Sequence, residues 1–277
     1  MPHFLVIGAH KSGTSALYHY LAQHPRLWAS REKENDFFGS DLRYSYGLYW
    51  YARRWDQRAP ADRLRFEASP QYLFDAATAA PRIRADLPTV RLIAVLRDPV
   101  SRAYSAWQMY RRQLADDPQF YVNLYSDRYT PAEALRVVPR TPVELEDFSV
   151  AVEREIECLA RGQRMQCSVV ELGLYGPQLA HYRERFPAER LLVLESTDLR
   201  ARRVETLNRV LDFLGLPAWD WAGTDLEEVF VGKKSATIPP RAAEQLRDYY
   251  VESNQMLAGL LDPLPDWARP SRESAAA

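Results

Sequence analysis

A short loop near the start of the chain combines glycine, lysine and hydroxyl side chains where an apolar segment gives way to a helical one. It reads Gly8-Ala9-His10-Lys11-Ser12-Gly13-Thr14-Ser15. The first backbone N–H groups of a helix have no partner inside the helix, and the helix dipole adds partial positive charge there. These groups and a nearby lysine favour an anion such as phosphate. The loop therefore predicts an anion-binding site.

This loop differs from the phosphate-binding loop of nucleoside-triphosphate enzymes. Gly8 and Gly13 have the spacing of G-x-x-x-x-G-K-[ST], but Thr14 occupies the lysine position and Lys11 lies three positions earlier. No downstream segment reads as a magnesium-binding acid, which disfavours Mg²⁺-dependent phosphoryl transfer. A small-molecule kinase with an unusual loop, or a simple glycine turn with a solvated lysine, stays open at this point.

Polar residues in two other segments could bind a phosphate group or act as a base. Arg97 and Ser105 lie in the segment Arg97-Asp98-Pro99-Val100-Ser101-Arg102-Ala103-Tyr104-Ser105. Arginine presents a planar fork of donors that suits phosphate, and a hydroxyl adds one donor. Glu34 ends the charged run Arg31-Glu32-Lys33-Glu34, and such a run usually marks a solvated face.

The elements that position these residues alternate between strands and helices. The predicted strands cover residues 4–7, 92–96 and 191–194, and the helices that follow them cover residues 14–23, 100–113 and 202–214. Further helices are predicted over residues 144–161, 178–185 and 241–261. We therefore expect an α/β fold with a central parallel sheet flanked by helices. One domain is expected over residues 1–268, followed by a disordered tail over residues 269–277.

Two of these segments resemble the sulfotransferases that use 3′-phosphoadenosine 5′-phosphosulfate (PAPS). The family's K-x-G-T-[ST]-[AS]-L corresponds to residues 11–17, and its R-[DE]-P-x-x-R-A-x-S corresponds to residues 97–105. The resemblance implies that Lys11, Ser12, Gly13, Thr14 and Ser15 hold the 5′-phosphosulfate in a P-loop-like turn. It also implies that Arg97 and Ser105 hold the 3′-phosphate.

The chain is more specifically similar to the heparan sulfate branch of that family. Lys33-Glu34-Asn35-Asp36-Phe37-Phe38 resembles its K-E-x-x-F-F segment, and residues 67–72 resemble its E-K-[ST]-x-x-Y segment. In that branch the glutamate of the K-E segment is the general base, which gives the role to Glu34. Lys11 would offset charge on the leaving phosphate, and no metal is required.

The late turn Gly232-Lys233-Lys234-Ser235 resembles the family loop that closes on the nucleotide. The resemblance implies that Lys233, Lys234 and Ser235 add to the 3′-phosphate site. An exposed basic turn is the alternative.

Composition excludes several classes of protein. The 36 cationic and 37 anionic side chains give a net charge of -1, which offers no general attraction to nucleic acid. The two cysteines, Cys158 and Cys167, form no zinc or redox motif. No apolar run approaches the length of a membrane span, and the chain has no basic signal-peptide start, so we expect a cytoplasmic protein.

The acceptor side departs from the heparan sulfate branch. The branch's lysine in E-K-[ST] is Ala68 here, and Asp36 replaces a frequent histidine. Aromatic residues are frequent after Glu34, at Phe37, Phe38, Tyr44, Tyr46, Tyr49, Trp50, Tyr51 and Trp55. We therefore expect a mostly uncharged small-molecule acceptor with a free hydroxyl, of the kind found in specialised metabolism. A basic rim formed by Arg53, Arg54, Arg111 and Arg112 would favour a polyanion instead.

The sequence as a whole thus predicts an enzyme, a PAPS-dependent sulfotransferase. The alternatives are a P-loop-type kinase, which would need ATP and Mg²⁺, and a non-catalytic module that keeps the nucleotide site. Acceptor identity, pathway and oligomeric state are not determined by the sequence.

Overall fold

A computed structural model describes residues 1–277 except 56–59, 61, 118, 120–136, 228–236 and 270–277. Its contacts group into two compact units. Unit 1 comprises residues 1–97, 127–130 and 181–233, and unit 2 comprises residues 98–126, 131–180 and 234–277. The expected α/β class with a central parallel sheet is confirmed. The extent of the domain, residues 1–268, stays a prediction.

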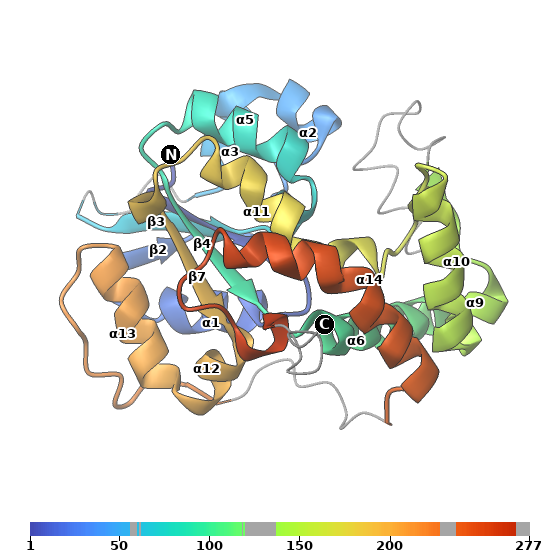
Figure 1. Ribbon diagram of the computed structural model, residues 1–277. Helices are drawn as coiled ribbons and strands as arrows, with labels where there is room; N and C mark the ends of the chain where they lie inside the picture. The colour runs from blue at the N-terminus through green and yellow to red at the C-terminus, as the bar shows by residue number, and fades with distance from the viewer. Residues whose placement is uncertain (56–59, 61, 118, 120–136, 228–236, 270–277) are drawn as a thin grey trace. The chain divides into compact units, whose positions relative to one another are not determined.

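Unit 1 contains a five-stranded sheet in which every neighbouring pair is parallel, in the order β2-β3-β1-β4-β7 (Figure 1). Its strands are β1 (Phe4–Gly8), β2 (Leu27–Ala29), β3 (Leu64–Ala68), β4 (Arg91–Leu96) and β7 (Leu191–Glu195). Its helices are α1 (Thr14–Ala22), α2 (Asp41–Ser45), α3 (Gly47–Ala52), α4 (Gln71–Phe74), α5 (Ala76–Asp86), α12 (Ser196–Ala201) and α13 (Arg203–Phe213), with a 3₁₀ turn at Ala188–Arg190.

Alternating side chains of the strands form the core on the two faces of this sheet. Phe4 and Val6 of β1 pack with Ile93 of β4 against apolar residues of α1 and α13, which cover one face (Figure 1). Leu5 and Ile7 are also fully buried and point to the opposite face, because successive strand side chains alternate. The sheet is therefore covered on both sides, as parallel sheets usually are.

The strand order places the loops after β1 and β4 at a point where the chain changes direction. From β1 the chain runs outward to β2 and returns through β3, whereas from β4 it runs to β7 on the other side. In open parallel sheets, ligands bind outside the carboxyl ends of the strands at such a point. The fold thus predicts a site next to Gly8 and Leu96.

Unit 2 is mainly helical. It contains α6 (Pro99–Asp116), α9 (Pro142–Glu146), α10 (Phe148–Ala160) and α14 (Pro240–Ala258), with 3₁₀ turns at Glu171–Gly173 and Asp266–Ala268 and a parallel pair of β5 (Val137–Val138) and β6 (Arg164–Met165). The helix α11 (Tyr175–Arg183) has residues in both units. Trp107 of α6, Phe148 of α10 and Leu246 of α14 belong to one buried cluster.

Two sequence expectations about elements were wrong or incomplete. The helix predicted over residues 144–161 is two helices, because the Asp147 side chain accepts the Ser149 and Val150 amides and starts α10 afresh. The strands β2 and β3 and the helices α2 to α5 were not predicted. No helix in the described part of the chain is long and apolar enough to cross a membrane.

The predicted tail, residues 269–277, is described only at its first residue. Arg269 donates to the Leu264 carbonyl and pairs with Asp266. Residues 270–277 lie outside the described residues.

Candidate active site

The loop after β1 is shaped by two residues with left-handed backbone conformations. Gly13 is the N-cap of α1 with φ 103° and ψ 13°, and Lys11 has φ 63°. An N-cap side chain usually accepts one of the first amides of a helix, but Gly13 has none and no side chain caps α1. The helix therefore begins with amides available to an external anion.

Close packing fixes this loop against the sheet. A Cβ atom at Gly8 would lie 2.5 Å from Leu73 Cβ, so only glycine allows β1 and α4 to approach as they do. The Ala9 amide donates to the Val95 carbonyl at 2.8 Å. Ser12 is almost fully buried, and its Oγ atom has no hydrogen-bond partner among the described atoms. A buried hydroxyl left without a partner is costly, and an anion in the loop would satisfy it.

Arg97 reaches this loop from the end of β4. Its Nη1 atom donates to the Lys11 carbonyl at 3.3 Å. Because β1 and β4 are parallel neighbours, the residues after their carboxyl ends meet at one edge of the sheet. The structure thus brings the Arg97 guanidinium to the backbone of Lys11, and the sequence assigned both residues to one nucleotide.

The other predicted nucleotide residues are only partly placed. Ser105 lies on α6 in unit 2 and is half-buried, on the same helical stripe as Ser101. Asp98 caps this helix by accepting the Ser101 amide at 2.7 Å, so its role in the motif is to start α6. The turn that contains Lys233, Lys234 and Ser235 lies outside the described residues.

Glu34 follows β2, which ends at the same edge of the sheet as β1 and β4. Its side chain is 39% exposed, and Oε1 lies 2.7 Å from Lys33 Nζ. Asp36, the other acid on this segment, is only 4% exposed and has φ 49°. Of the two carboxylates, Glu34 is the one accessible to a substrate.

Sequence reasoning gave no role to Glu67, at the end of β3. The residue is completely buried. Burial raises the pKa of Glu67, and hydrogen bonds from Tyr51 and Tyr72 partly oppose this effect. The feature of the sequence that could have indicated a role for Glu67 is an acidic residue at an inward position of a strand, two positions before Ser69.

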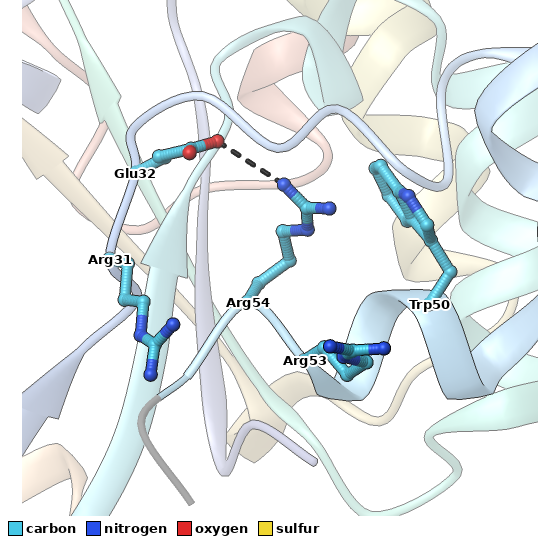
Figure 2. Close-up of a pocket in the computed structure, with 5 residues that line it drawn as sticks. All are labelled: Arg31, Glu32, Trp50, Arg53 and Arg54. Atoms are coloured by element: carbon cyan, nitrogen blue, oxygen red, sulfur yellow. Dashed lines mark hydrogen bonds and ion pairs between the residues drawn. The ribbon is translucent and has the colours of Figure 1, made fainter.

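A pocket of about 320 Å³ lies beside the segment that leads to Glu34. It is lined by Arg31, Glu32, Trp50, Arg53 and Arg54. Figure 2 shows the Arg54 guanidinium between Glu32 and the Trp50 ring, 3.3 Å from the Glu32 carboxylate and 4.0 Å from the ring centroid. The pocket is thus lined by three guanidinium groups, one carboxylate and an indole ring on which the Arg54 guanidinium stacks.

Half of the eight aromatic residues after Glu34 belong to the core, whereas Tyr46 and Tyr49 are exposed. Phe37, Phe38, Tyr51 and Trp55 are buried, and Phe37 stacks on Tyr51 with ring centroids 4.6 Å apart. Of the eight aromatic residues that the sequence offered as a pocket wall, Trp50 lines the pocket described above. Among the described residues, no group of three or more His, Cys, Asp or Glu side chains is arranged to hold a metal ion.

Comparison with known proteins decides the family. The family model described as a sulfotransferase domain matches residues 1–230. The chain belongs to the sulfotransferase family. Its resemblance to the heparan sulfate branch is supported by curated relatives. This sulfotransferase is 28% identical over 299 residues to the human bifunctional heparan sulfate N-deacetylase/N-sulfotransferase 3 and 26% identical over 311 residues to the Drosophila melanogaster bifunctional heparan sulfate N-deacetylase/N-sulfotransferase.

These two alignments cover 97% of this sulfotransferase but only 31% and 27% of the relatives. The chain thus spans about a third of their length. Among solved structures, a sulfotransferase from Alicyclobacillus acidocaldarius superimposes with a TM-score of 0.69 at 25% identity, covering 97% of this chain and 99% of that one. The sulfotransferase domain of the Synechococcus PCC 7002 olefin synthase superimposes with a TM-score of 0.54 at 16% identity, covering 96% of each chain, and shows the fold alone.

Membership of the family establishes the class of reaction. Sulfotransferases move a sulfo group, and the family uses PAPS as donor. This result decides against the kinase alternative. One departure from the heparan sulfate branch lies in the core. Ala68, where the branch has lysine, is buried in the cluster that includes apolar residues of α1.

Proposed function

We propose that this sulfotransferase transfers the sulfo group of PAPS to a hydroxyl of a small molecule, with Glu34 as the general base. The observation that carries the proposal is the Arg97 guanidinium next to the Lys11 carbonyl, at the uncapped start of α1. A guanidinium group beside uncapped helix amides, at a sheet's carboxyl edge, suits a polyanionic nucleotide.

The loop residues fit the 5′-phosphosulfate. Lys11, Gly13, Thr14 and Ser15 offer one ammonium group and the first amides of α1, and the buried Ser12 hydroxyl lacks a partner that an anion would supply. When bound, the donor supplies the sulfo group and leaves as adenosine 3′,5′-bisphosphate. Lys11, as a compact charge, stabilises the negative charge that develops on the leaving phosphate.

Arg97 and Ser105 are proposed to hold the 3′-phosphate, with Lys233, Lys234 and Ser235 from the late turn. The guanidinium group of Arg97 offers paired donors that match phosphate oxygens. Its Nη1 atom donates to the Lys11 carbonyl, which places the guanidinium group beside the loop.

Glu34 is proposed to accept the proton of the acceptor hydroxyl as the bond from oxygen to sulfur forms and the bond from sulfur to the bridging oxygen breaks. Its exposure and its position after β2, at the carboxyl edge, support this role. The neighbouring Lys33 ammonium holds Oε1 in a defined direction before reaction.

The acceptor is proposed to be a small molecule that enters beside the Trp50 pocket. Arg31, Arg53 and Arg54 line that pocket with one carboxylate, so the expectation of an uncharged acceptor is widened to molecules with one anionic group. Phenols, alcohols, hydroxy acids and heparin-like oligosaccharides, tested side by side as acceptors, distinguish these classes. Sulfation of the oligosaccharides alone, with steep salt dependence, would contradict a small acceptor. A cytoplasmic location and a role in specialised metabolism are part of the same proposal.

Nucleotide binding by an arginine variant tests the assignment directly. We expect adenosine 3′,5′-bisphosphate to raise the unfolding temperature of the wild type without added metal. Arg97→Ala should weaken binding by about 1.5–3 kcal/mol, because a charge-assisted contact is lost. Arg91→Ala, at the other end of β4, is the matched control and should bind normally. Equal affinities of wild type and Arg97→Ala would contradict the nucleotide site.

A further inference from the structure

The buried carboxylate of Glu67 is the centre of a hydrogen-bond network in unit 1. Oε1 accepts from the Tyr51 hydroxyl at 2.5 Å and from the Tyr72 hydroxyl at 2.7 Å, and Oε2 accepts from the Ser69 hydroxyl at 3.2 Å. Glu67, Tyr51, Tyr72 and Ser69 are all essentially inaccessible to solvent. A buried carboxylate is tolerated when hydrogen bonds satisfy it, and this one has three hydroxyl donors.

Two of these hydroxyls also contact the backbone that follows Glu34. The Asp36 amide donates to Ser69 Oγ at 3.0 Å, and the Phe37 amide donates to the Tyr72 hydroxyl at 3.0 Å. A hydroxyl has one hydrogen, so a hydroxyl that donates to Glu67 can only accept from an amide. By accepting the hydroxyl hydrogen, the carboxylate orients each hydroxyl so that its oxygen can accept from the amide.

Other contacts restrain the same short segment. Arg43 Nη1 donates to the Asn35 carbonyl at 2.9 Å, and the Phe37 ring stacks on the Tyr51 ring. The segment is thus held at residues 35, 36 and 37, whereas the Glu34 side chain is partly exposed. Arg43 Nη1 also lies 3.5 Å from the Glu34 carbonyl, so the restraints extend to the backbone of the proposed base.

An apolar side chain could fill the Glu67 position without the cost of removing a charge from water. Replacing buried charged groups by apolar ones is often neutral or stabilising, so packing alone gives no reason for a carboxylate here. The specific property that Glu67 adds is the orientation of two hydroxyls toward two backbone amides. That property is a matter of geometry more than of stability.

We propose that Glu67, acting through Ser69 and Tyr72, is a positioning residue that holds the segment of Glu34 in the geometry needed to take the acceptor's proton. This inference rests on the proposed function, because it takes Glu34 as the base. It adds that the base is positioned by a buried polar network in which residues from β3 and α4 hold the loop after β2.

A double-mutant cycle between Tyr72→Phe and Glu34→Gln tests the inference. Tyr72→Phe removes the acceptor of the Phe37 amide, and we expect kcat to fall roughly 10–100-fold with little change in KM for the donor, as for a misplaced catalytic group. In the Glu34→Gln background the same change should cost little more, because residues that act as a unit are not additive. Equal effects in both backgrounds would overturn the proposal.

The matched control is Tyr250→Phe. Like Tyr72, Tyr250 is a fully buried tyrosine, but its hydroxyl donates to the Val170 carbonyl and has no contact with the segment of Glu34 in the described hydrogen bonds. We expect this variant to keep the wild-type kcat. A loss as large as that of Tyr72→Phe would point to a general effect of buried hydroxyls and overturn the proposal. Ser69→Ala, which removes the other bridge, gives an independent variant if Tyr72→Phe does not fold.

Amide hydrogen exchange separates this inference from the proposed function, because it needs no acceptor. The Phe37 amide should exchange faster in Tyr72→Phe than in the wild type, and the Asp36 amide faster in Ser69→Ala. Unchanged exchange in both variants would overturn the network as a restraint. A wild-type turnover in Glu34→Gln would instead contradict the base assignment in the proposed function.

Discussion

Glu34 and Asp36 are two carboxylates on one short segment, and their surroundings give them different capabilities. Asp36 is buried, and its amide is tied to Ser69, whereas Glu34 extends partly into solvent beside Lys33. A general base must reach a proton on a substrate, so geometry favours Glu34. At the scale of single residues, accessibility is the feature that distinguishes the two acids.

Substitution of Glu34 by glutamine should remove the general base. We expect turnover to fall roughly 10²–10⁴-fold, the usual contribution of a positioned general base, while nucleotide affinity is kept. Glu157→Gln, at an exposed acid on α10 that pairs with Arg161, is the control and should retain turnover. Lys11→Ala should lose both nucleotide binding and rate. If Glu34→Gln kept its turnover at saturating acceptor, Asp36 would be the next candidate for the base.

The junction between β1 and α1 is the element on which the nucleotide site depends. Gly13 caps the helix in a left-handed conformation, and a Cβ there would lie 3.3 Å from Leu199 Cδ2. Residues other than glycine adopt such backbone angles at a cost of about 1–2 kcal/mol. The loop geometry and the stability of α1 are therefore linked at one position.

Substitution of Gly13 by alanine tests this link. We expect the free energy of unfolding to fall by about 1–2 kcal/mol, and nucleotide affinity to fall as well, because the amides of the loop move. Gly259→Ala is the matched control at the C-cap of α14, where φ is −84° and the nearest atom lies 3.6 Å from the added Cβ. Denaturant unfolding and nucleotide titration measure both effects. A Gly13→Ala protein as stable and as tight-binding as Gly259→Ala would refute the argument.

The stability of the whole fold should depend on pH through His24. Its ring is buried near Trp219 and Trp221, with centroids 4.7 and 5.7 Å away, and Nδ1 accepts the Arg26 amide at 3.1 Å. Burial, with a smaller effect of Arg26, lowers the pKa of His24 below its ordinary value of 6.5. Between the lowered value and 6.5, the unfolded chain binds a proton that the folded chain does not.

Because the unfolded chain takes up this proton more readily, protonation of His24 favours unfolding. The contribution of His24 to stability is present above pH 6.5 and is lost as pH falls toward its folded pKa. The wild type should therefore lose stability between pH 7 and pH 5 more steeply than His24→Asn, whose side-chain oxygen still accepts an amide. Denaturant unfolding of both proteins at several pH values measures the slopes. Parallel slopes would show that His24 does not contribute.

The sequence by itself determined the features that depend on contiguous residues. Three strands, the loop of residues 8–15 and the match of Arg97 to a phosphate motif were readable, because a loop, a helix start and an apolar strand are encoded by neighbours along the chain. Family membership follows from the same motifs. The lengths of most helices were also close to those observed.

The tertiary structure alone decided the features that join distant segments. The strands β2 and β3 are short, and β3 carries Arg65 and Glu67, so no apolar run marked them. Their places in the sheet come from pairing with β1, which is not a local property. The Glu67 network joins segments around residues 36, 51 and 72, and the pocket joins residues 31 and 54. Hydrogen bonds and cavities of this kind depend on how folded segments meet, and spacing along the chain does not specify that.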